Sequence, residues 1–290
     1  MDGRVFLQRF RFPGRDVDSF VIPTSELQSR PEAEICLPDG EPNGIRIDGP
    51  QIKIGLLLAL ESGYDGYVID EPYVQALAAP DVELRFVGYK NVADTLRKLN
   101  LDGLLLIGGN FDSPADYYLF PEKLPAGHRL SERSAAYLEA IAFAAGHKLP
   151  VLGICAGFQM LAGFFGAKMY TNVTAELGGG LAHKSDKYQD AHTVRLTPGT
   201  RLFELCGKKN EIMVNSVHTE GVAELAGSSE LVVSARSADG NVEAVEAREN
   251  WFALGVQWHP EYLRHRSPEA AALFAALSAA ARKYRQEKIK

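Results

Sequence analysis

Cys155 is the residue whose surroundings most clearly suggest chemistry. It follows the apolar run Val151-Leu-Gly-Ile154 and lies between Gly153 and Gly157, each two residues away. This G-x-C-x-G pattern is the thiol counterpart of a nucleophile elbow, where a strand turns sharply into a helix and exposes the nucleophile above the sheet. Glycines permit the close backbone approach of such a turn, and the first N–H groups of the helix favour a thiolate. Taken alone, the pattern also fits a small buried cysteine.

A candidate base for this thiol lies near the C-terminus of the chain. His259 and Glu261 flank Pro260 and follow the apolar run from Phe252 to Trp258. Side chains two residues apart on an extended backbone share a face, so Glu261 can bind one imidazole nitrogen while the other faces a thiol. A base oriented by a third group is the logic of a catalytic triad. The tripeptide alone could be an exposed strand end, but the two motifs together predict a cysteine nucleophile with a histidine base.

Composition argues against several classes of function. The 290 residues are 46% hydrophobic and 23% charged, as in ordinary globular proteins. A net charge of −6 argues against binding to nucleic acid or an anionic membrane. We find neither a signal-peptide core nor a run of about 18 apolar residues, so we expect a cytoplasmic protein without a membrane span. Three cysteines at unrelated spacings (Cys36, Cys155 and Cys206) predict neither a disulfide framework nor a zinc site, and we expect no metal or other cofactor.

Strands and helices alternate from residue 51 onward, and these elements must position the two motifs. We predict strands over residues 54–60, 82–87, 104–107, 151–155 and 252–258, and helices from residue 71, over 92–99, 131–145 and 157–165, and from residue 268. Such alternation predicts an α/β fold, with a mostly parallel sheet and helices on both faces. Alternating apolar runs after the Gly178–Gly180 loop predict a smaller antiparallel β portion, with a hairpin turn at Asp239-Gly240.

Residues 1–50 differ in character from the rest of the chain. They contain six prolines and show no sustained hydrophobic period. We therefore predict an N-terminal extension of short strands and loops over residues 1–50, and a catalytic domain over residues 51–290. The extension could pack on the core, support a homo-oligomer or reach a protein partner.

Two sequence motifs resemble a known superfamily. Gly153-Ile-Cys-Ala-Gly-Phe-Gln159 and Gly255-Val-Gln-Trp-His-Pro-Glu261 are similar to the motifs of the class I glutamine amidotransferases. The resemblance covers about residues 51–262 and implies a flavodoxin-like fold. Three further segments look most like the γ-glutamyl-γ-aminobutyrate hydrolase and γ-glutamyl hydrolase branch, namely residues 107–117, 192–202 and 214–218.

This resemblance implies a triad of Cys155, His259 and Glu261 acting on a small γ-glutamyl substrate. Cys155 would attack the γ-carbonyl of a glutamyl amide to form a thioester. His259 would protonate the leaving amine and activate water, and Glu261 would orient His259. The backbone N–H groups of Gly109 and Ala156 would form the oxyanion hole.

The resemblance also implies four substrate contacts, each with a plainer alternative. Gly108 would share the loop of Gly109, which could instead be an ordinary strand-end turn. Gln159 lies one helical turn after Cys155 and would contact the α-amino or α-carboxylate end of the glutamyl group, or else face solvent. Ser216 and His218 would line the glutamyl pocket, although His218 could be a surface histidine.

Departures from the branch leave the substrate and the type of activity open. Relatives often carry a basic residue where this chain has Ala156, and His-His-Gln where this chain has His218-Thr-Glu220. The acidic Glu220 suggests an amine-bearing leaving group, such as a γ-glutamylated polyamine; a folate poly-γ-glutamate ranks lower. Two other functions remain: a glutaminase that supplies ammonia to a separate synthase chain, and a non-catalytic binding protein. The chain carries no P-loop or G-x-G-x-x-G motif of its own.

Overall fold

The computed structural model describes residues 4–12, 18–29, 34–36, 51–60, 66–109, 112–227, 230–248 and 250–289. Its centre is a sheet of 11 strands in the order β13-β12-β15-β16-β17-β10-β9-β5-β8, with β14 and β11 joined through β16. The parallel strands are β5 (Ile52–Leu57), β8 (Val82–Val87), β9 (Gly103–Leu106), β10 (Val151–Ile154) and β17 (Ala253–Val256). The predicted α/β class is confirmed.

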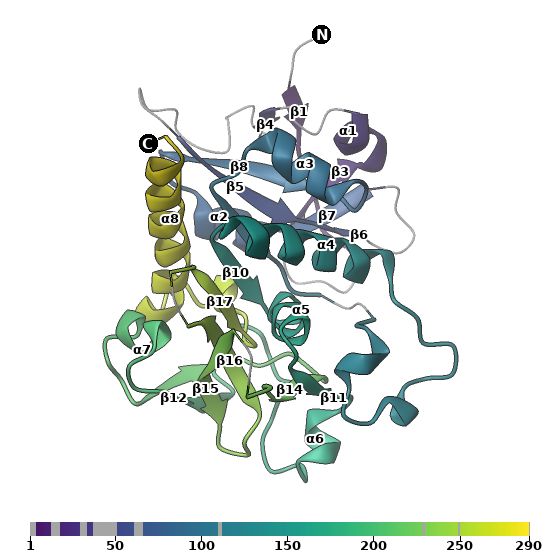
Figure 1. Cartoon of the computed structure of the whole chain (residues 1–290), viewed down its shortest axis with the longest axis vertical. Coiled ribbons are helices and arrows are strands. Elements are labelled where there is room, and N and C mark those ends of the chain that lie inside the picture. The colour runs from purple at the N-terminus through teal and green to yellow at the C-terminus, as the bar shows by residue number, and fades with distance from the viewer. Residues whose placement is uncertain are drawn as a thin grey trace.

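The antiparallel strands continue this sheet beyond β17. They are β11 (Lys168–Tyr170), β12 (His192–Leu196), β13 (Glu211–Val214), β14 (Gly221–Glu224), β15 (Leu231–Ser237) and β16 (Val242–Ala247). The antiparallel pairing of β16 with β17 joins the two portions. The antiparallel portion is therefore the lower half of one sheet rather than a separate unit (Figure 1).

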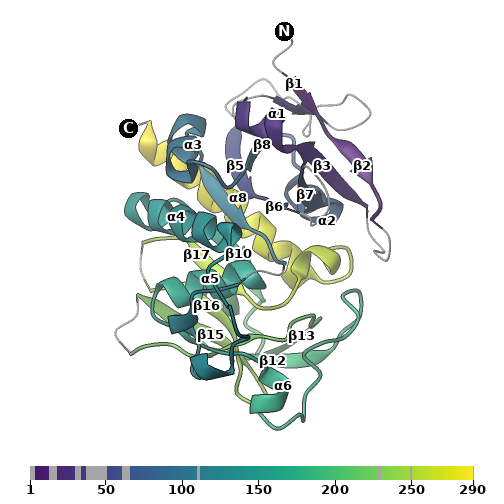
Figure 2. The same cartoon turned by 90° about the vertical axis from the view of Figure 1, so that its right-hand side faces the viewer.

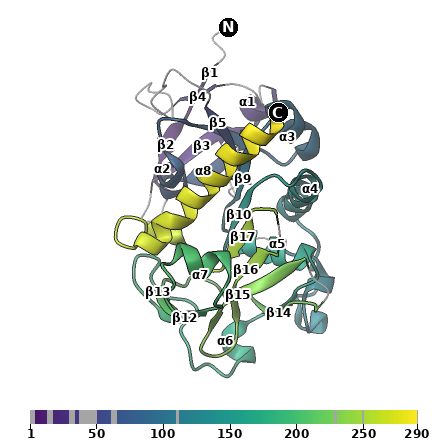
Figure 3. The same cartoon turned by 60° about the vertical axis from the view of Figure 1, so that its left-hand side comes forward.

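Helices cover both faces of the parallel strands. On one face lie α2 (Glu71–Leu77) and the long α8 (Pro268–Lys288), which packs on β5, β9 and β10 (Figure 3), while α7 (Arg201–Leu205) contacts α8 and the antiparallel strand β15. On the other face lie α3 (Val92–Leu99), α4 (Glu132–His147) and α5 (Ala156–Phe164). Burial on both faces explains why β9, β10 and β17 are unbroken apolar or glycine runs.

The described part of the N-terminal extension packs onto the rest of the chain. β3 (Ser19–Pro23) pairs antiparallel with β7 (Gly66–Asp70), and β2 (Gln8–Phe10) and β6 (Ala59–Leu60) complete a four-stranded sheet (Figure 2). Phe20 and Ile22 of β3 are buried in the same core as α2 and α8. β1 (Arg4–Phe6) pairs with β4 (Glu34–Cys36), and α1 (Thr24–Ser29) lies between β3 and β4 in the chain. Residues 37–50 lie outside the described residues, and both the boundary at residue 50 and a partner role for the extension stay predictions.

Four further elements are short. They are α6 (Val173–Glu176) and the 3-10 turns η1 (Ala115–Tyr117), η2 (Pro121–Lys123) and η3 (Pro260–Tyr262). Within the described residues, no helix has both the length and the apolar character needed to cross a membrane.

Candidate active site

The turn between β10 and α5 holds Cys155 in an unusual backbone conformation. Cys155 has φ 52° and ψ −110°, which places a non-glycine residue in a sparsely populated region. A Cβ on Gly157 would lie 2.2 Å from the carbonyl oxygen of Leu106, and one on Gly153 would lie 2.9 Å from the backbone of Gly157. Both glycines are therefore required by close backbone approach, as the G-x-C-x-G pattern predicted.

His259 and Glu261 lie where β17 ends and η3 begins. The Nδ1 atom of His259 is 2.6 Å from Oε1 of Glu261, and the Glu261 side chain is fully buried. Asn215 fixes the backbone of His259 from both sides: its Oδ1 accepts from the His259 N–H at 2.9 Å, and its Nδ2 donates to the His259 carbonyl at 2.9 Å. The imidazole is thus held both through its ring and through its backbone.

Gly108 lies between the imidazole and the thiol. A Cβ at this position would be 2.7 Å from Cε1 of His259 and 3.2 Å from Cβ of Cys155. The hydroxyl of Tyr73 in α2 accepts from the Gly108 N–H at 3.0 Å and lies 3.5 Å from Nδ1 of His259. Glycine at position 108 therefore leaves the space in which the histidine and the cysteine approach each other.

The surroundings of His259 favour its charged form. Burial opposes the charge, but the Glu261 carboxylate and the Cys155 sulfur outweigh it and raise the pKa of His259 well above the usual value. A protonated imidazole beside the sulfur can stabilise a thiolate and later donate its proton to a leaving group. The side chains can therefore support nucleophilic catalysis.

Arg133 holds the Gly108-Gly109 loop from the side of α4. Its buried guanidinium donates to the Gly108 carbonyl at 2.6 Å and to the Tyr137 hydroxyl at 3.0 Å. In a trans peptide the C=O and the following N–H point in opposite directions, so this contact turns the Gly109 N–H away from Arg133. Gly109 has φ +136°, and a Cβ there would lie 2.3 Å from Nη1 of Arg133. The positive φ and the close approach of Arg133 both require glycine at position 109.

A cleft of about 660 Å³ opens beside the sulfur. Its lining includes Cys155, Gly109, Ala156, Gln159 and His218, five of the residues selected from the sequence, together with Asp112, Thr171, Lys184, Val217, Thr219 and Glu220. The N–H of Ala156 is the first of α5 and has no partner within its own helix. The cleft thus brings together the Cys155 thiol, two carboxylates and one ammonium group beside the start of α5.

The remaining predicted contact residues occupy different positions. Gln159 is buried rather than facing solvent, and its Nε2 donates to the Glu220 carbonyl at 2.9 Å and to Oε1 of Gln257 at 3.0 Å. Gln257 in turn donates to the Cys155 sulfur at 3.7 Å. Ser216 is buried outside the cleft lining, and its hydroxyl donates to the His183 carbonyl at 2.8 Å. A substrate role for these side chains stays a prediction.

Sequence reasoning missed three residues that support the site. Tyr73, Arg133 and Asn215 lie on α2, on α4 and just after β13, far from either motif along the chain. The signal for Asn215 was available, because it stands in the segment 214–218 that resembled the hydrolase branch. Tyr73 and Arg133 gave no local signal, since both lie in ordinary amphipathic helices.

Comparisons with known proteins show which family this sequence resembles. The Peptidase C26 family matches residues 71–261. A Schizosaccharomyces pombe protein named "Putative glutamine amidotransferase PB2B2.05" is 32% identical over 75% of this chain and 83% of its own length. The γ-glutamyl-γ-aminobutyrate hydrolase PuuD of Escherichia coli K12 is 32% identical over 56% of this chain and 65% of its own length.

Two solved structures share the fold at 18% identity. The glutaminase domain of Trypanosoma brucei CTPS with bound acivicin has a TM-score of 0.56 and covers 80% of this chain and 94% of that domain. A "putative gmp synthase subunit a protein" of Thermoplasma acidophilum has a TM-score of 0.58 and covers 83% of this chain and all of that one. These likenesses establish the predicted architecture.

Proposed function

Because this chain belongs to the Peptidase C26 family, we propose that it is a cysteine-dependent hydrolase of γ-glutamyl amides. The observation that carries the proposal is the buried His259–Glu261 pair beside Cys155, a residue that lines a polar cleft. The predicted triad of Cys155, His259 and Glu261 supplies the chemistry. The similarity to E. coli PuuD supports γ-glutamyl amides as the substrate class.

In the first half-reaction the Cys155 thiolate attacks the γ-carbonyl carbon of the substrate. The carbonyl π electrons move onto oxygen, giving a tetrahedral oxyanion. When this intermediate collapses, the C–N bond breaks and the His259 imidazolium gives its proton to the departing amine. A glutamyl thioester on Cys155 and a neutral imidazole remain.

In the second half-reaction His259 takes a proton from a water molecule that attacks the thioester. The C–S bond breaks, free glutamate leaves, and the thiolate–imidazolium pair is restored. Glu261 orients the ring throughout. The Tyr73 hydroxyl lies close enough to His259 to limit rotation of the ring.

The N–H groups of Gly109 and Ala156 are the proposed donors to the oxyanion. Removing one such donor typically lowers the rate by about 10²–10³. Arg133 is a positioning residue here, because it holds the carbonyl of the Gly108-Gly109 peptide and so directs its N–H.

Charges in the cleft suggest how a substrate would be oriented. Lys184 is suited to a carboxylate of the glutamyl group. Asp112 and Glu220 are suited to a cationic amine, either the α-ammonium or a second amine on the leaving group. The hydroxyl of Tyr118 donates to Glu220 at 2.9 Å and fixes that carboxylate in place. We therefore place an amine-bearing leaving group first among γ-glutamyl amides.

A panel of γ-glutamyl amides with cationic, neutral and acidic leaving amines tests the proposal. We expect glutamate release by the wild type and none by Cys155→Ala, while Cys206→Ala, which removes a thiol outside the cleft, remains active. Glu220→Gln should lower kcat/KM for cationic leaving groups and leave neutral ones nearly unchanged. A folded wild type that hydrolyses no member of the panel would refute hydrolase activity, and equal rates across the panel would refute the charge preference.

A second candidate is a glutaminase that passes ammonia to a synthase chain. It draws support from the two structural neighbours, which are described as a synthase subunit and a CTPS glutaminase domain. Assaying glutamine hydrolysis with and without cell extract separates the two functions. Activity on glutamine that appears only with extract favours the second candidate, whereas hydrolysis of γ-glutamyl amides by the purified chain favours the first.

A further inference from the structure

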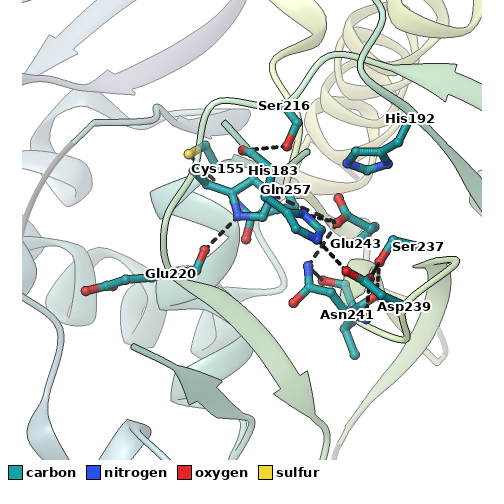
Figure 4. Close-up of polar contacts among 12 residues, drawn as sticks. Cys155, His183, His192, Ser216, Glu220, Ser237, Asp239, Asn241, Glu243 and Gln257 are labelled. Atoms are coloured by element: carbon teal, nitrogen blue, oxygen red, sulfur yellow. Dashed lines mark hydrogen bonds and ion pairs between the residues drawn. The ribbon is translucent and has the colours of Figure 1, made fainter. Parts of the chain in front are cut away.

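A second group of buried polar side chains reaches the cleft through His218 and takes no bond-making or proton-transfer step in the proposed reaction. It consists of His183 in the loop before β12, His218 in the loop after β13, and Glu243 on β16. Their relative exposures are 1%, 6% and 1%. One ligand atom from each lies within 4.8 Å of those of the other two. Figure 4 shows His183 and Glu243 together on the side away from the Cys155 sulfur.

The hydrogen bonds of the two histidines determine which nitrogens face the centre of this group. His218 Nδ1 lies 2.8 Å from the Glu220 carbonyl, which can only accept, so Nδ1 carries the proton. With the proton on Nδ1, the neutral tautomer of His218 leaves the lone pair of Nε2 available as a ligand. His183 Nε2 lies 2.7 Å from the Asp239 carboxylate and is likewise a donor. Among the described residues, His183 Nδ1 and His218 Nε2 have no hydrogen-bond partner.

These two nitrogens approach the same carboxylate oxygen at more than hydrogen-bond distance. Oε1 of Glu243 is 3.8 Å from His183 Nδ1 and 3.9 Å from His218 Nε2. Zinc binds nitrogen and carboxylate oxygen at about 2.0–2.2 Å, so tetrahedral ligands lie about 3.4 Å apart. These two distances exceed that value by about 0.5 Å, and the two nitrogens lie within 4.8 Å of each other, so side-chain rotations would have to draw all three ligand atoms inward to hold an ion.

Each of the three side chains is also oriented by an outer partner. Asp239 binds His183 and accepts from the Ser237 hydroxyl at 2.6 Å, and the Glu220 carbonyl binds His218. The Asn241 amide donates to Glu243 Oε1 at 2.9 Å (Figure 4). Carboxylates and carbonyls that hold the second nitrogen of a histidine are typical of metal sites, where they fix the ring and its tautomer.

We propose that His183, His218 and Glu243 bind one divalent transition-metal ion of the zinc type. Two imidazoles and one carboxylate form a ligand set that zinc proteins use, with a fourth position left for water. The ion would compensate the buried carboxylate and satisfy two buried nitrogens, which otherwise carry a desolvation cost. The sequence did not predict this site, because its ligands come from three separate elements and include no cysteine.

The position of the site gives the ion a structural role beside the cleft. Lys184 and Val217, each next to a ligand, form a bridge between the two loops and line the cleft. The ion would tie both loops to β16 and so hold one wall of the cleft. Cys155 chemistry does not require it, and the proposal therefore stands or falls independently of the proposed hydrolase.

The test measures metal binding in the full-length chain. Cys155→Ala serves as the starting protein, because a thiolate beside an imidazole can itself bind zinc. After growth with added zinc and dialysis against metal-free buffer, elemental analysis should give about one zinc per chain. Adding zinc to about 100 times its Kd should raise the Tm of the metal-free protein by about 5 °C. When Co²⁺ replaces the zinc, visible absorption bands typical of cobalt bound by nitrogen and oxygen ligands should appear.

Two substitutions and a matched control complete the experiment. Glu243→Gln keeps the volume of the side chain but removes the anionic ligand, and His218→Gln removes one nitrogen ligand. Both should lose the stoichiometric zinc and the Tm shift, whereas His265→Gln, on the exposed surface, should keep both. Equal zinc content in the Glu243→Gln protein would overturn the proposal. A folded starting protein that binds neither zinc nor cobalt would overturn it without recourse to any variant.

Discussion

Replacing Gly108 by alanine should separate the histidine from the thiol with little other change. The added Cβ would lie 2.7 Å from Cε1 of His259, whereas carbon atoms in contact are about 3.5–4.0 Å apart. The imidazole must therefore move by about 1 Å, because Tyr73 and Cys155, at 3.0 Å and 3.2 Å from the same Cβ, leave little space on the other sides. A displacement of about 1 Å in a catalytic group can lower the rate by about 10²-fold.

We expect Gly108→Ala to lower kcat about 100-fold with a smaller change in KM, because the cleft beyond the sulfur is untouched. Overpacking should cost about 1–3 kcal/mol of unfolding free energy. The assays are hydrolysis of a chromogenic γ-glutamyl anilide and the rate of Cys155 alkylation by iodoacetamide. Alkylation needs no knowledge of the natural substrate. It should slow because a displaced His259 no longer stabilises the thiolate.

Gly146→Ala is the matched control for this substitution. Gly146 lies in α4, and a Cβ there would meet nothing within 4 Å. This variant should keep full activity and gain about 0.5–1 kcal/mol of stability, since alanine is the better helix former. Wild-type kcat and wild-type alkylation in a folded Gly108→Ala protein would refute the claim that Gly108 maintains the space between base and nucleophile.

Three further substitutions or reactions probe the same site. Glu261→Gln removes the carboxylate that raises the pKa of His259, so the alkaline limit of the pH–rate profile should move to lower pH; an unchanged limit would mean that another group sets it. The raised pKa of His259 also affects the free energy of unfolding. Its contribution is fully present below the unfolded pKa of about 6.5 and is lost as the pH rises through the folded pKa. Asn215→Ala should cost about 1–3 kcal/mol in thermal unfolding, because it leaves two buried backbone groups of His259 unpaired, and should lower kcat more than KM. Iodoacetamide at neutral pH should label Cys155 long before Cys206, whose pKa burial raises to about 12, and peptide mapping that finds the reverse order would contradict the assigned environments.

Local signals were sufficient to predict the frame of the site. The G-x-C-x-G elbow and the strand-terminal His-x-Glu could be found from sequence because each is a short pattern with a steric or geometric cause. Gly157 must be glycine because the carbonyl of Leu106 is 2.2 Å from any Cβ there, and such a requirement leaves a visible trace in the sequence. The starts of α4 and α8, at Ser131 and Ser267, could also be predicted from sequence, since both serines accept hydrogen bonds from the first helical turn.

What could not be predicted depends on contacts between distant segments. Tyr73 and Arg133 reach the Gly108-Gly109 loop from opposite faces of the sheet, and their own neighbours in sequence give no sign of it. The same limit applies to the register that joins the antiparallel strands to β17. Periodicity along the chain shows which face of a strand is buried but not which strand lies beside it, so the pairing of β16 with β17 could not be predicted.

The segment from Asn215 to Glu220 connects the features on which these proposals depend. Asn215 fixes the backbone of His259, His218 faces Glu243, and the Glu220 carbonyl accepts from both His218 and Gln159. Because this loop is held at several separate points, the hydrogen bonds of Asn215 to the His259 backbone can stay in place when the contacts at His218 are lost. Ordering of this loop by a metal ion should therefore lower KM through the cleft wall and leave the bond-breaking chemistry at Cys155 unchanged. Zinc removal that lowered kcat at constant KM would show instead that the loop acts mainly through Asn215 and His259.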